Sequence, residues 1–137
     1  MKALIYDIIA TAGLIDSSGA KVLRPLGLTP MTFNILSVLT DGPLSQREIG
    51  DRVIVAASSI TFQMHQLQRR GLIKRRRADA RTWRVSLTDE GEALHGRAAM
   101  LMDALIVRLP VSAAQAAQAS AVLLTIRQNL QQLVAQA

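Results

Sequence analysis

The sequence predicts a mainly α-helical fold that contains one small β-hairpin. The composition gives the first reason: 50% of the residues are hydrophobic but only 3% are aromatic, a balance that favours helices over a β-sandwich. Apolar residues recur at helical spacing over most of the chain, and one short segment alternates instead between apolar and polar residues. Turn and capping residues separate these segments, which sets the order of the elements.

Two helices are expected before the middle of the chain. Residues 3–16 have apolar side chains at helical spacing, and Ser17-Ser18-Gly19 weakens the pattern, so the first helix is expected to be short. Thr29 then caps a second helix that has Pro30 at its first position. Asp41-Gly42-Pro43 ends this second helix. Its apolar face consists of Ile35, Leu36 and Leu39.

A helix-turn-helix follows. Ser45 and Glu48 have the spacing of a capping box, which opens a short helix. After a β-branched turn at Ile54-Val55, a longer helix is expected over residues 56–70, and Gly71 ends it with a positive φ angle. The buried positions of the two helices are Ile49 and Val53, then Ile60, Met64 and Leu67.

The next segment predicts the β-hairpin, with strands over residues 73–77 and 82–87 and a turn at 78–81. In the second strand, apolar Trp83, Val85 and Leu87 alternate with polar residues, which is the pattern of a half-buried strand. Trp83 is accordingly assigned to the hairpin core rather than to a surface on which bases stack.

Two helices complete the chain. Thr88 caps the first of them, Asp89 and Glu90 lie in its first turn where the helix dipole favours acids, and Pro110 ends it. The last helix begins at a second capping box of Ser112 and Gln115, and its apolar residues repeat in alternating threes and fours, as in a coiled coil. The terminal helices hold more apolar surface than a 137-residue monomer can easily bury. In this order, the middle of the chain is a winged helix-turn-helix.

Composition excludes several classes of function. The chain has no cysteine, and His65 and His95 are isolated, so neither a thiolate site nor a metal site is expected. We expect no enzyme and no cofactor, because no Ser-His-Asp set, paired carboxylates or glycine-rich phosphate loop stands out. Asp7 interrupts the N-terminal apolar run, and residues 109–126 are too polar to span a membrane. The sequence therefore indicates a soluble, cytoplasmic protein.

Positive charge is concentrated in one short segment. Eight of the sixteen Lys and Arg residues lie between Arg69 and Arg84, with a single acid, Asp79, whereas the net charge of the whole chain is +6. The remainder of the chain is therefore close to neutral. Such a cationic edge attracts a polyanion.

The helix ahead of this segment has an outward face without a carboxylate. Hydroxyls near its start can approach base edges, His65 and Gln66 can read hydrogen-bonding groups, and Phe62 can contact a thymine methyl group. The alternative is an ordinary solvated face, but such faces usually carry Glu and Asp. The predicted contact residues are Ser58, Thr61, Phe62, His65 and Arg69, with Ser59 and Gln66 on the flanks.

The hairpin supplies a second contact with DNA. A carboxylate at its tip repels phosphate, so Asp79 is interpreted as holding Arg81 in a fixed pose for the minor groove. The alternative is that Asp79 only supplies turn chemistry. Phosphate contacts that set the register without reading sequence are assigned to Arg75, Arg76, Arg77 and Arg84. Two other functions stay open: a winged helix that binds protein, and a nucleoid protein that binds DNA without sequence preference.

The stretch from Leu28 to Gly91 resembles the MarR family of winged-helix transcription regulators. Its signature, Asp-x-Arg, five residues and Leu-Thr, stands here as Asp79-Ala80-Arg81 followed by Leu87-Thr88. Three further segments are similar: Leu28-Thr29, Gly42-Pro43-Leu44-Ser45, and Leu67 through Gly71-Leu72-Ile73. The chain departs from the family at Ala56, Ala57 and Phe62, where polar residues or arginine are frequent, so the wing is expected to supply more of the affinity.

The resemblance implies a homodimer that binds a pseudo-palindromic operator on double-stranded DNA, usually as a repressor. It implies three segments of one intertwined domain: 1–27, an N-terminal dimerisation helix and connection, 28–91, the DNA-binding lobe, and 92–137, the C-terminal dimerisation helices. It adds Ser45 and Gln46 to the DNA contacts, and a small aromatic or anionic effector as a partner. Tyr6, Met31, Phe33 and His95 are candidates to line its pocket, with packing or surface positions as the favoured alternative. The predicted dimer interface consists of Leu4, Ile8, Leu101, Leu105, Leu123, Ile126, Leu130 and Leu133.

Overall fold

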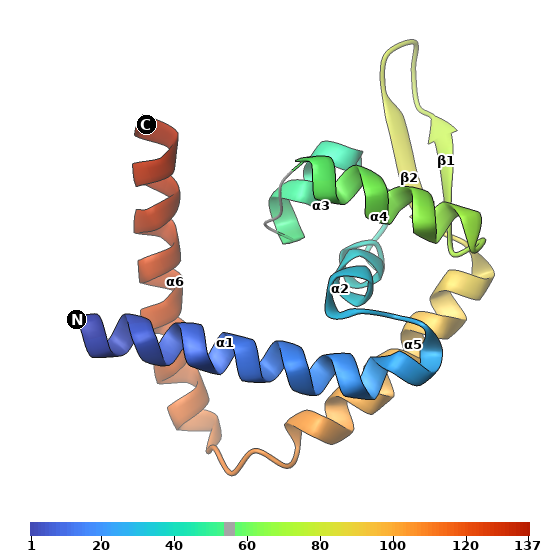
Figure 1. Ribbon diagram of the computed structural model, residues 1–137. Helices are drawn as coiled ribbons and strands as arrows, with labels where there is room; N and C mark the ends of the chain where they lie inside the picture. Colours follow the sequence, from blue (N-terminus) through green and yellow to red (C-terminus); the bar gives the residue numbers. More distant parts are fainter. Residues whose placement is uncertain (54–56) are drawn as a thin grey trace. The chain divides into compact units, whose positions relative to one another are not determined.

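The computed structural model of the chain describes residues 1–53 and 57–137, and for Ala57 and Ser58 it describes the backbone alone. The mainly helical fold with one antiparallel hairpin is confirmed (Figure 1). The predicted turn at Ile54 and Val55, together with Ala56, lies outside the described residues. The elements are α1 (Lys2–Leu23), the 3-10 helix η1 (Arg24–Leu26), α2 (Pro30–Val38), α3 (Gln46–Val53), α4 (Ala57–Arg69), β1 (Ile73–Arg77), β2 (Trp83–Leu87), α5 (Asp89–Ile106) and α6 (Ala113–Gln136).

The chain forms two compact units, residues 1–106 and residues 107–137. The first unit contains α1 to α5 and the hairpin, and the second contains α6. The division into segments 1–27, 28–91 and 92–137 concerns the assembled protein and stays a prediction.

The first unit is built on one apolar core. The predicted inward residues of α2, α3 and α4 are buried except Val53, which is half-buried and packs against the core. Val85 extends the same core into the hairpin. Each fully buried Leu or Ile contributes about 1.5–3 kcal/mol of transfer free energy. The largest side chains with 0% exposure are Leu23, Ile35, Leu36, Ile49, Leu67 and Val85.

The predicted caps of α2 and α3 are present. The Thr29 hydroxyl accepts a hydrogen bond from the Thr32 backbone N–H at 3.2 Å, and the Thr29 N–H donates to the Thr32 hydroxyl at 2.8 Å. Ser45 and Glu48 make the equivalent pair at the start of α3, at 2.8 and 3.1 Å. These contacts satisfy amide groups that a helix N-terminus otherwise leaves without partners.

The first helix is longer than its sequence predicts. It runs without interruption from Lys2 to Leu23, through the Ser17-Ser18-Gly19 segment that was expected to weaken it. Gly19 is buried, and a Cβ atom there would lie 3.4 Å from Met102 Cε on α5. That distance is an ordinary contact, so Gly19 lies where α1 packs on α5 without the packing requiring glycine. The packing of the two helices outweighs the low helix propensity of this segment.

The hairpin is attached to the lobe at its base and free at its tip. Leu44 and Val85 exchange two backbone hydrogen bonds of 3.0 and 2.7 Å, which dock the segment ahead of α3 on β2. Figure 1 shows the two strands extending from this base past α4 to an exposed turn.

A close junction fixes where α4, β1 and α5 meet. Gly71 has a φ angle of +72°, as predicted for the residue that ends α4. The Thr88 hydroxyl donates to the Gly71 carbonyl at 2.5 Å and accepts from the Gly91 N–H at 3.0 Å. A Cβ atom on Gly91 would lie 1.9 Å from the Leu72 carbonyl oxygen, so this contact requires glycine.

The second unit consists mainly of α6, which begins at the predicted capping box. The Ser112 hydroxyl accepts from the Gln115 N–H at 3.1 Å, and the Gln115 side chain accepts from the Ser112 N–H at 3.0 Å. No residue of α6 is buried. Among the described helices, none is both long and apolar enough to cross a membrane.

Candidate nucleic-acid interface

The outward face of α4 is the first part of the site. Ile60, Met64 and Leu67 are at most 3% exposed and face the core, as predicted. Phe62, which is 60% exposed, lies on the opposite side although it is a large apolar residue. The predicted contact residues Ser59, Thr61, His65 and Arg69 are also exposed, Gln66 is half-buried, and the side chain of Ser58 lies outside the described residues.

Helices α3 and α4 are joined by a contact between two predicted site residues. The Gln46 side-chain amide donates a hydrogen bond of 2.9 Å to the Thr61 hydroxyl. This bond links the first residue of α3 to the exposed face of α4, and the half-buried Ser45 precedes it. The two residues therefore orient one another as well as belonging to the predicted surface.

Arg84 has a partner inside the protein that the sequence analysis missed. Its Nη1 lies 3.3 Å from Glu48 Oε2, and the same oxygen accepts the Ser45 N–H at 2.8 Å. The Ser45 N–H, followed by the Arg84 guanidinium, lowers the pKa of the Glu48 carboxyl. Arg84 therefore ties β2 to the start of α3. The capping box identified Glu48, but no local signal pairs it with a residue so distant in sequence.

At the tip, Asp79 contacts the main chain. One carboxylate oxygen accepts the backbone N–H groups of Arg81 and Thr82, both at 2.8 Å. These two bonds lower the pKa of Asp79. Asp79 thus fixes the backbone that carries Arg81, and within the described residues no ion pair joins the two side chains. The observed contact is the turn chemistry that was the alternative interpretation.

The assignment of Trp83 to the hairpin core is wrong. The side chain is 45% exposed, whereas Val85 two residues along is completely buried. Trp83 pairs across the hairpin with Arg77, so its neighbour on the opposite strand is a cation instead of an apolar side chain. The guanidinium groups of Arg75 and Arg77 lie over its ring, 5.7 and 5.4 Å from the centroid. The alternation of apolar and polar residues in β2 correctly predicts the face on which Trp83 lies. It does not show that the apolar core ends at Val85.

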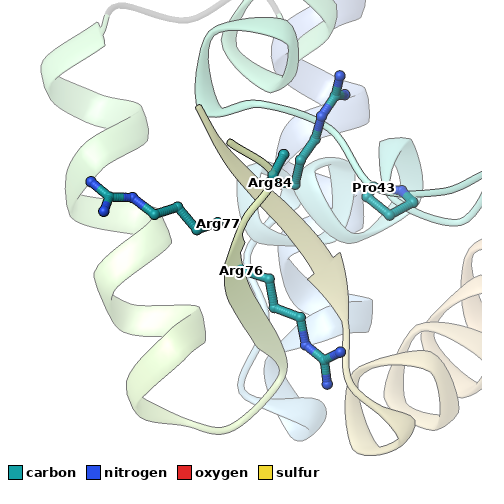
Figure 2. A pocket seen from close by; sticks show the side chains of 5 residues that line it. Pro43, Arg76, Arg77 and Arg84 are labelled. Carbon is teal, nitrogen blue, oxygen red and sulfur yellow. The ribbon is translucent and has the colours of Figure 1, made fainter. Parts of the chain in front are cut away.

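Three arginines of the hairpin line an open hollow of about 400 Å³. Its lining residues are Pro43, Arg76, Arg77, Ala78 and Arg84. Arg76 and Arg84 are directly opposite one another in the strand register, an arrangement in which like charges repel. Figure 2 shows the labelled guanidinium groups pointing away from one another. The hollow therefore suits an extended polyanion along the hairpin better than one small enclosed anion.

Arg70 belongs to the cationic segment in sequence but not to the exposed hairpin. Its Nη1 donates to the Gly27 carbonyl at 2.6 Å, and its Nη2 donates to the Leu26 carbonyl at 3.1 Å. Gly27 has a φ angle of +65°, which presents these carbonyls at the end of η1. Arg70 thus anchors the end of α4 to the connection between α1 and α2.

A stacked pair of rings lies between α2 and α5. Phe33 and His95 have centroids 5.4 Å apart and an interplanar angle of 13°. The Ser37 hydroxyl gives its proton to the Phe33 carbonyl, so it accepts from His95 Nε2 at 3.0 Å. Partial burial lowers the pKa of His95. Of the four candidate pocket residues, Phe33 and Met31 pack against the core, whereas Tyr6 is 72% exposed.

The residues predicted to form a dimer interface all remain at least partly exposed in the single chain. Leu4 is 39% exposed, and Leu101 and Leu123 are each 41% exposed. Leu130 and Leu133 are exposed, and Ile8, Leu105 and Ile126 are half-buried. These side chains are available to a second copy, and the interface itself stays a prediction.

The sequence matches the family model of the MarR family over residues 26–81. It is 35% identical over 91 residues to YwoH, an uncharacterized HTH-type transcriptional regulator of Bacillus subtilis, and the match covers 65% of this chain and 66% of YwoH. An uncharacterized HTH-type regulator of Bacillus cereus is 35% identical over 77 residues, which cover 56% of this chain and 52% of that protein. The matched part thus spans between half and two thirds of these relatives.

Solved structures share the fold over nearly the whole chain. Sco5413, a MarR family regulator from Streptomyces coelicolor, has a TM-score of 0.83 and 26% identity, covering 96% of this chain and 95% of its own. MosR of Mycobacterium tuberculosis, solved with DNA, has a TM-score of 0.81 and 24% identity, covering 94% and 96%. Rv2887 of the same organism, solved with salicylic acid, has a TM-score of 0.71 and 25% identity, covering 90% and 95%. As the wing motif predicted, the chain belongs to the MarR family of winged helix-turn-helix transcription regulators.

Proposed function

We propose that this chain binds double-stranded DNA in a sequence-specific manner and regulates transcription as a homodimer on a pseudo-palindromic operator. One observation carries the proposal: an exposed helix face that contains no carboxylate lies beside a hairpin rich in arginine. A solvated surface without function has no need to exclude acids from one face and collect cations next to it. A long polyanion is the partner that this distribution of charge attracts.

In this proposal α4 enters the major groove. The hydroxyls of Ser59 and Thr61 approach the bases near the start of the helix, His65 and Gln66 donate or accept hydrogen bonds, and Phe62 contacts a thymine methyl group. The Gln46–Thr61 hydrogen bond of 2.9 Å limits the orientations that both side chains sample before DNA is bound.

The hairpin enters the adjacent minor groove with Arg81 at its tip. Asp79 holds the turn through two backbone hydrogen bonds, so the start of the Arg81 side chain has a defined position. Arg76 and Arg77 contact phosphates from the two faces of β1. Arg84 exchanges part of its interaction with Glu48 for a phosphate, because the pair is about half exposed and therefore weak, at 44% and 47%.

Two copies place two α4 helices about 34 Å apart, one turn of DNA, so that they enter successive major grooves. The apolar side chains exposed on α1, α5 and α6 supply the surface that joins the copies. Repression follows if the bound dimer excludes polymerase from a promoter. A small aromatic or anionic effector releases the dimer from DNA if it binds more tightly to a dimer whose two DNA-binding lobes have a different spacing. The complex of the relative Rv2887 with salicylic acid supports an effector of this kind.

Selection of bound duplexes from a random pool at physiological salt tests the proposal. An inverted repeat with half-sites one helical turn apart is expected. With roughly four phosphates neutralised per protomer, log K should fall against log salt with a slope of about −7. Equal displacement by random DNA would indicate a nucleoid protein instead, and no binding at low ionic strength would favour a protein-binding adaptor.

A further inference from the structure

The tryptophan of the hairpin is partly exposed and lies beside arginine side chains. It is the only Trp in the chain, and it is 45% exposed at the outer end of β2. At this exposure, part of the indole ring is open to neighbouring side chains. Here the partners are two arginines: the guanidinium carbons of Arg75 and Arg77 lie 5.7 and 5.4 Å from the ring centroid, within the range of a cation–π contact.

The hairpin register places these three side chains together. Arg77 is directly opposite Trp83, and Arg75 is two residues earlier on β1, so all three lie on one face of the hairpin. Val85, the partner of Arg75, is completely buried and holds this part of β2 against the core. The ring is thus anchored on its inner side, and the two guanidinium groups rest on it from the facing strand.

Arg75 is less exposed than Arg76 and Arg77 on the same strand. The residue is half-buried, and its Nε is buried with no hydrogen-bond partner among the residues that the structure describes. The inner part of the guanidinium is therefore shielded from solvent. Arg76, between the two, belongs to the other face of β1 and is exposed, so it offers a matched comparison.

We propose that Trp83 is a positioning residue that holds Arg75 and Arg77 as a preformed pair of guanidinium groups for two phosphates of the DNA backbone. This inference rests on the proposed DNA-binding function. A free arginine loses much of its rotamer freedom when it binds phosphate, and a ring that restricts it beforehand reduces that loss. The same contacts occupy the ring, which argues against a base stacking on it.

The contact itself can be tested in the free protein, because all tryptophan fluorescence comes from Trp83. Two guanidinium groups beside the ring concentrate iodide there, whereas neutral acrylamide is unaffected. The ratio of iodide to acrylamide quenching constants is expected to fall in Arg75→Ala and in Arg77→Ala, and to change little in Arg76→Ala. An equal ratio in all three variants and the parent would overturn the proposed pair.

The consequence is tested by anisotropy titration with a selected duplex. Trp83→Ala is expected to weaken binding about tenfold, because Arg75 and Arg77 must then be ordered on binding, which costs binding free energy for each side chain. Trp83→Phe keeps a ring and most of the affinity. In double-mutant cycles Trp83→Ala couples to Arg77→Ala and is additive with Arg76→Ala. Equal coupling to both arginines would reveal a general loss of hairpin structure and reject a positioning role. If the parent protein bound no duplex, the proposed function would fail, and the phosphate role of the two arginines would fail with it. The quenching ratio would still show whether the arginines contact the Trp83 ring.

Discussion

Helix α4 and the hairpin lie side by side in the first unit, but different forces hold them. α4 buries Ile60, Met64 and Leu67, a stripe that anchors it along its whole length. The hairpin is anchored at its base by Ile73 and Val85. Beyond them, the contacts seen among the described residues are polar, cation–π and turn contacts. Changes in α4 are therefore expected to alter mainly stability, and changes in the outer hairpin mainly affinity for DNA.

The largest effect is expected from removing the central anchor of α4. Leu67 is completely buried, and Leu67→Ala removes its transfer free energy and leaves a cavity, at a cost of about 2–5 kcal/mol. Gln68 is the exposed neighbour, and Gln68→Ala should change stability by less than about 0.5 kcal/mol. Urea unfolding followed by circular dichroism measures both. A cost below about 1 kcal/mol for Leu67→Ala would show that α4 is not held by its stripe.

The next largest effect on stability is expected from a substitution at the junction between the hairpin and α5. A Cβ atom on Gly91 would collide with the Leu72 carbonyl at 1.9 Å, so Gly91→Ala must move backbone, at a cost of about 1–3 kcal/mol or more. Gly96 is on the same helix with nothing within 4 Å, and Gly96→Ala should stabilise by about 0.5–1 kcal/mol. Thermal unfolding of both variants tests these two expectations. Equal melting temperatures would contradict the close approach of Gly91 to the Leu72 carbonyl.

Two arginines of the cationic segment are expected to affect different properties, one the affinity for DNA and the other the stability of the fold. Arg81→Ala should weaken operator binding by about 1–3 kcal/mol per site and leave stability unchanged, because its side chain is exposed at the tip. Arg70→Ala should lower stability, because two carbonyls near the end of η1 lose a charged donor. Anisotropy titration and urea unfolding of each variant separate the two effects. An unchanged affinity in Arg81→Ala would remove the tip from the mechanism.

The sequence predicts the inward face of α4 and the helix caps better than it predicts the contacts of the hairpin, because the former depend on neighbouring residues. The inward face of α4 follows from a repeat of 3.6 residues, and the caps at Thr29, Ser45 and Ser112 need only neighbours within one turn. These features are local, so they can be read from the chain.

Features that depend on distant partners were missed or misassigned. Nothing near Arg84 in sequence indicates that it pairs with Glu48, and nothing near Arg70 indicates the carbonyls of Gly27 and Leu26. The predicted length of α1 is too short for the same reason, because the packing of α1 on α5 leaves no local signal near Gly19. Eight cations in one segment correctly located a charged edge, but at least two of them have structural partners.

The smallest effect is expected from pH, and it tests a contact remote from both regions. Partial burial lowers the pKa of His95, so the folded protein binds its proton less readily than the unfolded chain does. The unfolded state then holds more protons once the pH falls through the unperturbed value of about 6.5, and stability should decrease from there downward. Above that pH the contribution of His95 should be constant.

His95→Gln removes the titrating group and keeps a side chain that can hydrogen-bond to Ser37. Its stability between pH 5 and pH 7.5 should therefore vary less than that of the parent, as measured by urea unfolding at each pH. His65→Gln is the matched control, because His65 is exposed on α4 and far from the stacked pair in sequence. If His65→Gln flattened the profile and His95→Gln did not, pH would act through α4 instead of through the packing of α2 on α5.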